Sequence, residues 1–524
     1  MEPGNGGARS LEPSAKLCTT SNGSNQVYDV QLETAAPGCG PSEMNTFVTA
    51  VPDFGVDVSI RGSVAVRDAA VRLEERFLEL TAHMDFTLVS SYDKLSLLRN
   101  QFTYLVQNLT SIGLTFATTL NSATTSNSNV TGTFEPIMLS VSQLQTLQIT
   151  QISGIIGEID NIVGAPVRAE LQDTFDRFYS SVQNMYGALI QLIAAIQSSN
   201  SPGNINSAFV FHVNRAVDLL RANVLPLNYT IGSTGENIRV ADAFLRRLSL
   251  AMQTGGNTVR SEVRRYKRHV GQLASATHQA AECTRQEVSE LSATSLLQTL
   301  CNLSSEECPL QAAVQSVVES TTTEFNRVIG AVEQHFEHLS EQSDFVEELT
   351  ERFSDIYELG LLLADVAIIK RPYSLYCFNK FAHLVEQLIT RLTDGVTVCL
   401  RQELTRLRSL QSSLVNMLAT LVYDVEDVME HLQLCTMTLY RSECVTELGM
   451  LYDHLATQLE GKLDAIENFS HAESNASYKR LQLCVFHSKA TVFLMNIPNL
   501  RDDIETCRYS GPNLHQPVKM VGEH

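Results

Sequence analysis

The sequence predicts an all-α protein in which long antiparallel helices form elongated bundles or coiled coils, linked by disulfides at the helix ends. Three observations support this fold class. Apolar residues recur at steps of three and four from about residue 66 to residue 497, which keeps one side of a helix apolar. No segment shows the sustained alternation of a half-buried β-strand. Aromatic residues make up only 7% of the chain and tryptophan is absent, a composition that suits helices packed side by side.

Three segments carry the clearest apolar stripes, and we expect each to pack against a neighbouring helix rather than to bind a cofactor. The first stripe comprises Leu171, Phe175, Phe178, Val182, Met185, Leu189, Leu192 and Ile196. The second comprises Leu400, Leu404, Leu407, Leu414, Leu418, Leu421, Val425, Val428 and Leu432. The third comprises Phe325, Val328, Val332, Phe336, Leu339, Val346, Phe353 and Ile356.

Breaks in the pattern divide the chain into six segments. The stretch TTLNSATTSNSNVTGTFEP is typical of a flexible connector, and TGGN at 254–257 is expected to interrupt a helix. Arg371-Pro372 and Gly511-Pro512 indicate further boundaries, because a helix tends to end before proline. We therefore expect an irregular arm at 1–60, a helical segment at 61–109, a Ser/Thr/Asn-rich linker at 110–136, a long-helix module at 137–370, a six-cysteine helical module at 371–510 and a polar tail at 511–524.

The formal net charge is −20 at pH 7. A nucleic-acid-binding protein needs a basic face, so we predict no nucleic-acid partner. The most apolar run, LGLLLADVAII at 359–369, contains Asp365 and is too short to cross about 30 Å of hydrocarbon. We therefore predict no transmembrane segment.

The cysteines are distributed unevenly. The interval 40–282 contains none, whereas six fall in the last third of the chain. Two residues 22 positions apart on one unbroken helix are about 33 Å apart, but a disulfide needs Cα atoms within about 7 Å. Cys377 therefore cannot pair with Cys399, nor Cys484 with Cys507, unless the helix between them folds back. We expect these thiols to mark helix ends that are joined to the ends of neighbouring helices.

Ten cysteines are candidates for disulfides, and one is left over. The ten are Cys18, Cys39, Cys301, Cys308, Cys377, Cys399, Cys435, Cys444, Cys484 and Cys507. The remaining Cys283 is the candidate for an unpaired thiol or for an intermolecular bridge in a homodimer. TRQEVSEL after Cys283 is similar to LRQELTRL after Cys399, so segment 137–370 could hold a degenerate repeat of the later module. The alternative is that the cysteines are reduced core thiols of a cytosolic protein.

Residues 376–507 place six cysteines in a helical frame. The frame reads LYCFNKFAHLVEQLI, a second cysteine after 21 residues, CTMTLYRSEC, LCVFHSKA and a final cysteine after 22 residues. This arrangement resembles the TsetseEP-domain family of secreted helical proteins from dipteran insects, over about a quarter of the chain. The resemblance implies an extracellular, disulfide-linked module. It supplies no catalytic or binding residue, because none is established for that family.

Seven asparagines lie in N-x-S/T glycosylation sequons. They are Asn22, Asn108, Asn129, Asn228, Asn302, Asn468 and Asn475. We expect Asn302 and Asn475 to lie in turns, where a glycan is tolerated. The first residues show no secretory signal, so an extracellular location requires a truncated or misannotated start. If Met1 is the native start, we expect a cytoplasmic protein instead.

The basic segment VRSEVRRYKRH stands out in an acidic chain. Its Arg265-Tyr266-Lys267-Arg268 has the R-x-K-R form that furin-like convertases cut, and Arg264 precedes it. Proteases need an extended strand, however, and the helical pattern continues through the site. A solvated helix face is the main expectation, with a contact patch for an acidic partner as another option.

The sequence contains none of the common catalytic or phosphate-binding motifs, including G-x-S-x-G, H-E-x-x-H, C-x-x-C and the Rossmann fingerprint. We therefore expect no enzymatic activity and no cofactor. His335 and His338 could share a helix face, but only Glu333 and Glu337 are nearby as further zinc ligands. The acidic run YDVEDVMEH at 423–431 flanks an apolar stripe, so we expect the wet side of a helix rather than an acid–base pair.

These observations favour a secreted, non-catalytic interaction or structural protein that presents an acidic helical surface, at gut or haemolymph interfaces if the family resemblance holds. The partner is a protein or glycan that the sequence does not identify. One alternative is an extracellular helical-bundle carrier of a small apolar ligand. A second is an intracellular coiled-coil scaffold, which becomes the leading hypothesis if Met1 is the native start.

Overall fold

The computed structural model describes residues 53–57, 59–126, 129–199, 205–292, 297–298 and 309–511. The chain divides into two units, 1–49 and 50–524, and every described residue belongs to the second unit. Within the described residues the secondary structure is helical, and the one β-bridge joins two residues of a tight turn. The predicted all-α fold is therefore confirmed.

The described part of the chain is almost entirely helical. In chain order they are α1 (Ser63–Ala82), α2 (Asp93–Ala123), α3 (Val130–Leu147), α4 (Ser153–Val163), α5 (Ala165–Ser198), α6 (Ser207–Ser292), α8 (Pro309–Gln342), α9 (Phe353–Ile368), α10 (Ser374–Met437), α11 (Arg441–Ala490) and α12 (Ile497–Ser510). The π-helical turns η1 (Gln148–Ile152) and η4 (Thr491–Asn496) join α3 to α4 and α11 to α12, and the 3₁₀ segment η3 (Ser343–Arg352) joins α8 to α9.

All three predicted apolar stripes are buried. The 171–196 stripe lies in α5, the 400–432 stripe in α10, and the 325–356 stripe continues through α8, η3 and α9. Burying one such Leu, Val or Phe side chain contributes about 1.5–3 kcal/mol relative to leaving it exposed. Packing of these stripes, rather than helix propensity, therefore accounts for most of the helical stability.

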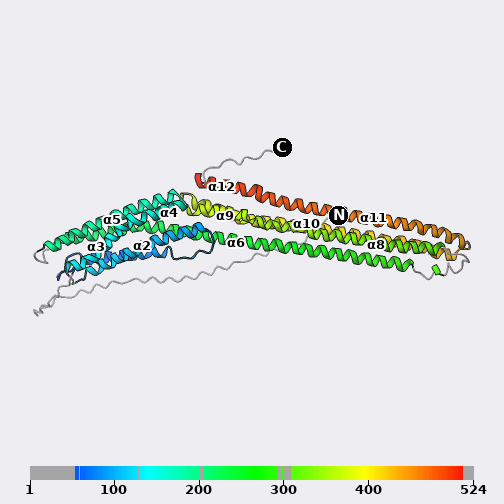
Figure 1. The fold of residues 1–524 in the computed structure, drawn as a ribbon, viewed down its shortest axis with the longest axis horizontal. Coiled ribbons are helices and arrows are strands. Elements are labelled where there is room, and N and C mark those ends of the chain that lie inside the picture. Colours follow the sequence, from blue (N-terminus) through cyan, green and yellow to red (C-terminus); the bar gives the residue numbers. More distant parts are fainter. Residues whose placement is uncertain are drawn as a thin grey trace, which may run out of the picture. The chain divides into compact units, whose positions relative to one another are not determined.

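Helices α6, α8, α10 and α11 form a four-helix bundle (Figure 1). α6 contacts α8 and α10, and α11 contacts the same two helices. α6 and α10 run in the same direction, because Arg247 pairs with Glu386 and Glu262 with Arg401. The chain order is therefore up-down-up-down. α6 is antiparallel to α8, and α10 is antiparallel to α11, whereas the contacting pairs α6/α10 and α8/α11 are parallel.

Two hydrophobic cores share α6. The first core includes α1 to α5, the first part of α6 up to Leu248, α9 and the beginning of α10. The second begins at Val259 of α6 and includes α8, most of α10 and α11. A helix of 86 residues spans about 130 Å, which is why one helix can serve both cores. None of the described helices is long and apolar enough to cross a membrane.

The linker predicted at 110–136 is corrected by the structure, because α2 continues to Ala123 and α3 begins at Val130. Threonine hydroxyls in α2 donate to carbonyls one turn back, as Thr118 does to Leu114 O at 2.8 Å. The Ser/Thr composition is thereby accommodated in a helix whose other side buries Phe116. Residues 124–129 separate the two helices.

The break predicted at 254–257 is also corrected, because α6 passes through this segment without interruption. Glycine in a helix costs about 1 kcal/mol relative to alanine. At Gly255, however, a Cβ atom would lie 2.7 Å from Cγ2 of Ile389 on α10. The glycine therefore permits a close approach of α6 and α10 that a larger residue would prevent. The boundary predicted at Arg371-Pro372 coincides with the turn between α9 and α10.

The last residues of the predicted irregular arm at 1–60 pack into the first core. The Asp53 carboxylate accepts hydrogen bonds from the Ile60 backbone N–H at 2.6 Å and from the Ser63 hydroxyl at 2.9 Å. Phe54 is fully buried and stacks on Phe134. This end of the arm is therefore part of the folded unit.

Candidate functional site

Three disulfides connect α10 to the helices that run back along it. They are Cys377–Cys507, Cys399–Cys484 and Cys435–Cys444, with Cα–Cα distances of 5.9, 5.8 and 5.7 Å. The first joins the start of α10 to α12, and the last closes the turn between α10 and α11. We call α10, α11, η4 and α12 with these three bonds the stapled hairpin.

The Cys399–Cys484 bond differs from the expectation that the thiols mark helix ends, because it joins the interiors of α10 and α11. Two antiparallel helices in contact bring facing residues together at any height, so a bridge is not restricted to the ends. Nearby, a Cβ atom on Gly395 would lie 2.6 Å from the Ser488 hydroxyl oxygen. This glycine therefore allows the two helices to approach closely beside the bond.

The other candidate cysteines have different outcomes. Cys283 lies on α6 as an exposed free thiol. Cys18, Cys39, Cys301 and Cys308 lie outside the described residues.

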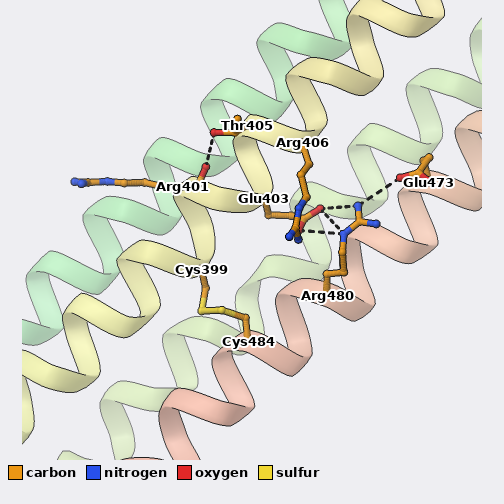
Figure 2. Close-up of polar contacts among 8 residues, drawn as sticks. All are labelled: Cys399, Arg401, Glu403, Thr405, Arg406, Glu473, Arg480 and Cys484. Atoms are coloured by element: carbon orange, nitrogen blue, oxygen red, sulfur yellow. Dashed lines mark hydrogen bonds and ion pairs between the residues drawn. A yellow bond between two sulfur atoms is a disulfide. The ribbon is translucent and has the colours of Figure 1, made fainter.

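A buried carboxylate lies one helical turn from the central disulfide. Glu403 on α10 is only 2% exposed. Its Oε1 accepts a hydrogen bond from Nη2 of Arg480 on α11 at 2.9 Å, and its Oε2 accepts one from Nη1 of Arg406 at 3.0 Å. Figure 2 shows Glu403 between the two guanidinium groups, with Glu473 contacting Arg480 at 3.4 Å. We call these four residues the Glu403 cluster.

The sequence places this carboxylate in the core because Glu403 lies between Leu400 and Leu404 of the α10 stripe. A buried charge is costly unless it is paired and hydrogen-bonded, and the Arg480 guanidinium supplies both. Arg480 precedes Cys484 by one turn, as Cys399 precedes Glu403. The disulfide and the ion pair are therefore adjacent cross-links between the same two helices (Figure 2).

The electrostatics of the cluster favour a structural role. The hydrogen bonds that Arg480 donates to Glu403 are the main reason why the pKa of Arg480 is raised. On α6, burial is the main reason why the pKa of Tyr266 is raised, and the nearby Glu403 carboxylate raises it further. Tyr266 therefore stays protonated and Arg480 charged. Arg406 and Arg480 donate hydrogen bonds to the Glu403 carboxylate, and the cluster holds α10 and α11 in register.

The basic segment predicted at 264–268 lies within α6. Arg264 and Arg268 are exposed, Arg265 pairs with Glu262 at 3.3 Å, and Lys267 pairs with Asp344. This arrangement matches a solvated helix face with ion pairs. Cleavage after Arg268 would require α6 to unwind where Val270 is buried.

His335 and His338 lie on α8, and His335 contacts a third histidine, His471 of α11. The His335 and His471 ring centroids are 5.1 Å apart. Burial is the main reason why the pKa of His335 is lowered, and His471 and His338 lower it further. No group of three or more His, Cys, Asp or Glu residues in the described part of the chain is arranged to hold a metal ion.

The acidic run at 423–431 lies on α10, where Glu426, Asp427 and Glu430 are exposed as expected. Asp424 pairs with Lys462 of α11. A groove of about 520 Å³ lies between this part of α10 and the C-terminal part of α6. It is lined by Thr284, Glu287, Glu290, Ala419, Val422, Tyr423 and Glu426.

The described sequons divide into exposed and partly buried positions. Asn129, Asn468 and Asn475 are exposed. Asn475 lies inside α11 rather than in the predicted turn, because the buried side of the helix continues past it through Ser470, Ser474 and Ser477 to Leu481.

The remaining sequons are less accessible or are not described. Asn108 on α2 is partly buried. Asn228 on α6 is also partly buried and donates to Glu79 at 3.0 Å, so a glycan there would disrupt this contact. Asn22 and Asn302 lie outside the described residues.

Sequence reasoning missed the residues that meet across helices. Glu403 had a local signal, since it is a carboxylate beside two stripe leucines. Its partner Arg480 lies 77 residues later, and His471 and Thr284 are similarly remote from the residues that they meet. Such pairs follow from helix order and register, which spacing within one helix does not specify.

Comparison with known proteins finds no matching protein-family profile, no matching curated protein and no matching solved structure.

Proposed function

We propose that the protein is a secreted, non-catalytic interaction protein that presents an acidic helical surface to a partner. The observation that carries the proposal is the stapled hairpin, in which three cysteine pairs are bridged across antiparallel helices. Disulfides form and persist in oxidising compartments such as the extracellular space and are rare in the cytosol. The formal net charge of −20 supports the idea that this surface is acidic. The resemblance to the TsetseEP-domain family would imply the same compartment.

The arrangement of the polar clusters supports a binding role rather than catalysis. The Glu403 carboxylate accepts hydrogen bonds from Arg406 and Arg480. His335 and His338 do not belong to any group of residues in the described part of the chain that could hold a metal ion. The grooves found between the helices are lined largely by Glu, Thr, Ser and His residues. Such linings suit polar partners better than a small apolar ligand, so the interaction role is preferred to the carrier.

The redox state of the cysteines in the native protein tests the proposal. The protein, isolated from its source cells with a thiol-blocking reagent present, is unfolded without reductant, alkylated and digested for mass spectrometry. We expect the six hairpin cysteines to remain unlabelled and Cys283 to be labelled, while a reduced control labels all 11 cysteines. If all cysteines were labelled without reductant, the hypothesis of a secreted protein would be rejected in favour of an intracellular coiled-coil scaffold.

A further inference from the structure

The groove between α6 and α10 combines negative charge with an apolar floor. Glu287 and Glu290 of α6 and Glu426 of α10 line it and are exposed. Between them lie Val422, which is 9% exposed, and Tyr423, which is 61% exposed. We call this site, with the lining given above, the acidic groove. It therefore offers carboxylates and an apolar contact side by side.

The nearby cations do not neutralise these carboxylates. Arg285 pairs with Glu282, and Lys462 pairs with Asp424. Among the described residues, the seven that line the groove include no Lys, Arg or His. The negative charge of the acidic groove is therefore available to a positively charged partner.

A second observation concerns a hydroxyl that a ligand in the groove could reach. Thr284 lines the groove and is only 7% exposed, yet its hydroxyl makes no hydrogen bond within the part of the chain that the structure describes. Threonines elsewhere on α6 donate to the carbonyl one turn back, as Thr277 does to Leu273 O at 2.9 Å. The hydroxyl oxygen of Thr284 is not among the buried side-chain atoms that lack a partner, so it is accessible from the groove and can accept a hydrogen bond from an ammonium or guanidinium there.

We propose that the acidic groove binds an amphipathic helix of a partner protein that carries Lys or Arg beside a bulky apolar residue. The apolar residue packs on Val422 and Tyr423, while the cations meet Glu287, Glu290 and Glu426. Amphipathic helices commonly dock into grooves in this way, and the groove volume of about 520 Å³ holds a few side chains. The inference rests on the proposed interaction function and identifies where and by what chemistry the partner binds.

The probe for this proposal is a synthetic amphipathic Leu/Lys helix of about 20 residues, long enough to be helical in water. Its binding to the full chain is measured by fluorescence anisotropy at about 0.15 M salt, where weak long-range attraction is screened. We expect Glu287→Gln, Glu290→Gln and Glu426→Gln together to weaken binding about tenfold. A Leu→Ser version of the peptide, with the same charge, should also bind about tenfold more weakly.

A matched variant controls for the overall charge of the protein. Asp502→Asn, Asp503→Asn and Glu505→Gln on α12 remove the same number of exposed carboxylates outside the groove and should change binding by less than about twofold. Equal weakening by both triple variants would overturn the proposal, since the peptide would then be attracted only by net charge. Equal binding of the Leu→Ser peptide, or displacement of the probe by stoichiometric spermidine, would overturn it as well.

Crosslinking on the unmodified protein provides a second test that does not depend on variant folding. A Leu/Lys peptide with a photoreactive leucine analogue should crosslink to segments 284–290 and 419–426. Crosslinks found only elsewhere would place the binding surface outside the groove and refute the inference. The proposed function would survive that result, because its own test is the disulfide state of the hairpin cysteines.

Discussion

Replacing Arg480 with methionine should loosen the stapled hairpin around Glu403. The methionine keeps most of the apolar stem of Arg480 but removes the guanidinium that reaches both Glu403 oxygens. Glu403 would then be buried with Arg406 as its remaining charged partner.

The expected magnitude follows from the burial of the two partners. Breaking a fully buried ion pair costs about 3–5 kcal/mol. Here Glu403 is 2% exposed but the Arg480 side chain is 34% exposed, and Arg406 still donates one hydrogen bond. We therefore expect Arg480→Met to lower the free energy of local opening of the hairpin by less than this, about 2–3 kcal/mol. Since about 1.4 kcal/mol is a factor of ten, amide exchange near the cluster should accelerate about 30- to 140-fold.

Hydrogen exchange measured by mass spectrometry is the suitable assay, because a chain with two cores is not expected to unfold in one step. The comparison uses peptides from 400–410 and 475–485, with peptides from α2 as an internal control. The double variant Glu403→Leu with Arg480→Met should recover most of the loss, because no unpaired charge remains buried. If the effects of the two substitutions on the opening free energy simply added, Glu403 and Arg480 would not act as a pair, and this prediction would be wrong.

Three further predictions address the disulfides, the histidines and the free thiol. Cys399→Ser with Cys484→Ser should lower the free energy of opening of the hairpin by about 4 kcal/mol, because the bond closes a loop with a sequence separation of 85; a change below about 1 kcal/mol, measured by hydrogen exchange of peptides from α10 and α11, would contradict this. The pKa of His335 is lowered by burial, so its contribution to stability is present above about pH 6.5 and lost as pH falls through the lowered folded-state pKa. Exchange near His335, corrected for intrinsic rates, should therefore increase from pH 7.5 to pH 5, and His335→Gln should flatten this dependence. Any disulfide-linked dimer on a non-reducing gel should disappear in Cys283→Ser, since Cys283 is an exposed free thiol; persistence of the dimer would assign the bridge to another cysteine.

The fold class was predictable because apolar spacing is a local property of each helix. The stripes of α5 and α10 were identified residue by residue, and every stripe residue is buried. The errors came from composition. The Ser/Thr-rich end of α2 and Gly255 of α6 were interpreted as breaks, but hydroxyl-to-carbonyl hydrogen bonds and close helix packing accommodate them.

The candidate sites were less predictable because they depend on contacts between helices. The spacing of Cys377 and Cys399 excluded their pairing with each other, but it did not select Cys507 and Cys484 as partners. That choice requires the antiparallel direction of α10 and α11 and their relative register. The acidic groove likewise needs α6 and α10 to run in parallel, which no stretch of either helix reveals alone.

The Cys399–Cys484 bond and the Glu403–Arg480 ion pair lie one helical turn apart, and together they can fix the register of two helices that pack through leucine-rich stripes. Sliding α11 along α10 by one heptad would replace most apolar contacts with similar ones, so the stripes alone determine register weakly. Only one register brings Glu403 to Arg480, and any other would leave a buried carboxylate without its partner on α11. We therefore expect the ion pair to select the register before oxidation, and the Cys399–Cys484 bond then to make it permanent. Refolding of the reduced Glu403→Leu, Arg480→Met variant tests this order: it should give more mispaired disulfides than the unmodified chain, and an unchanged disulfide pattern would show that packing alone sets the register.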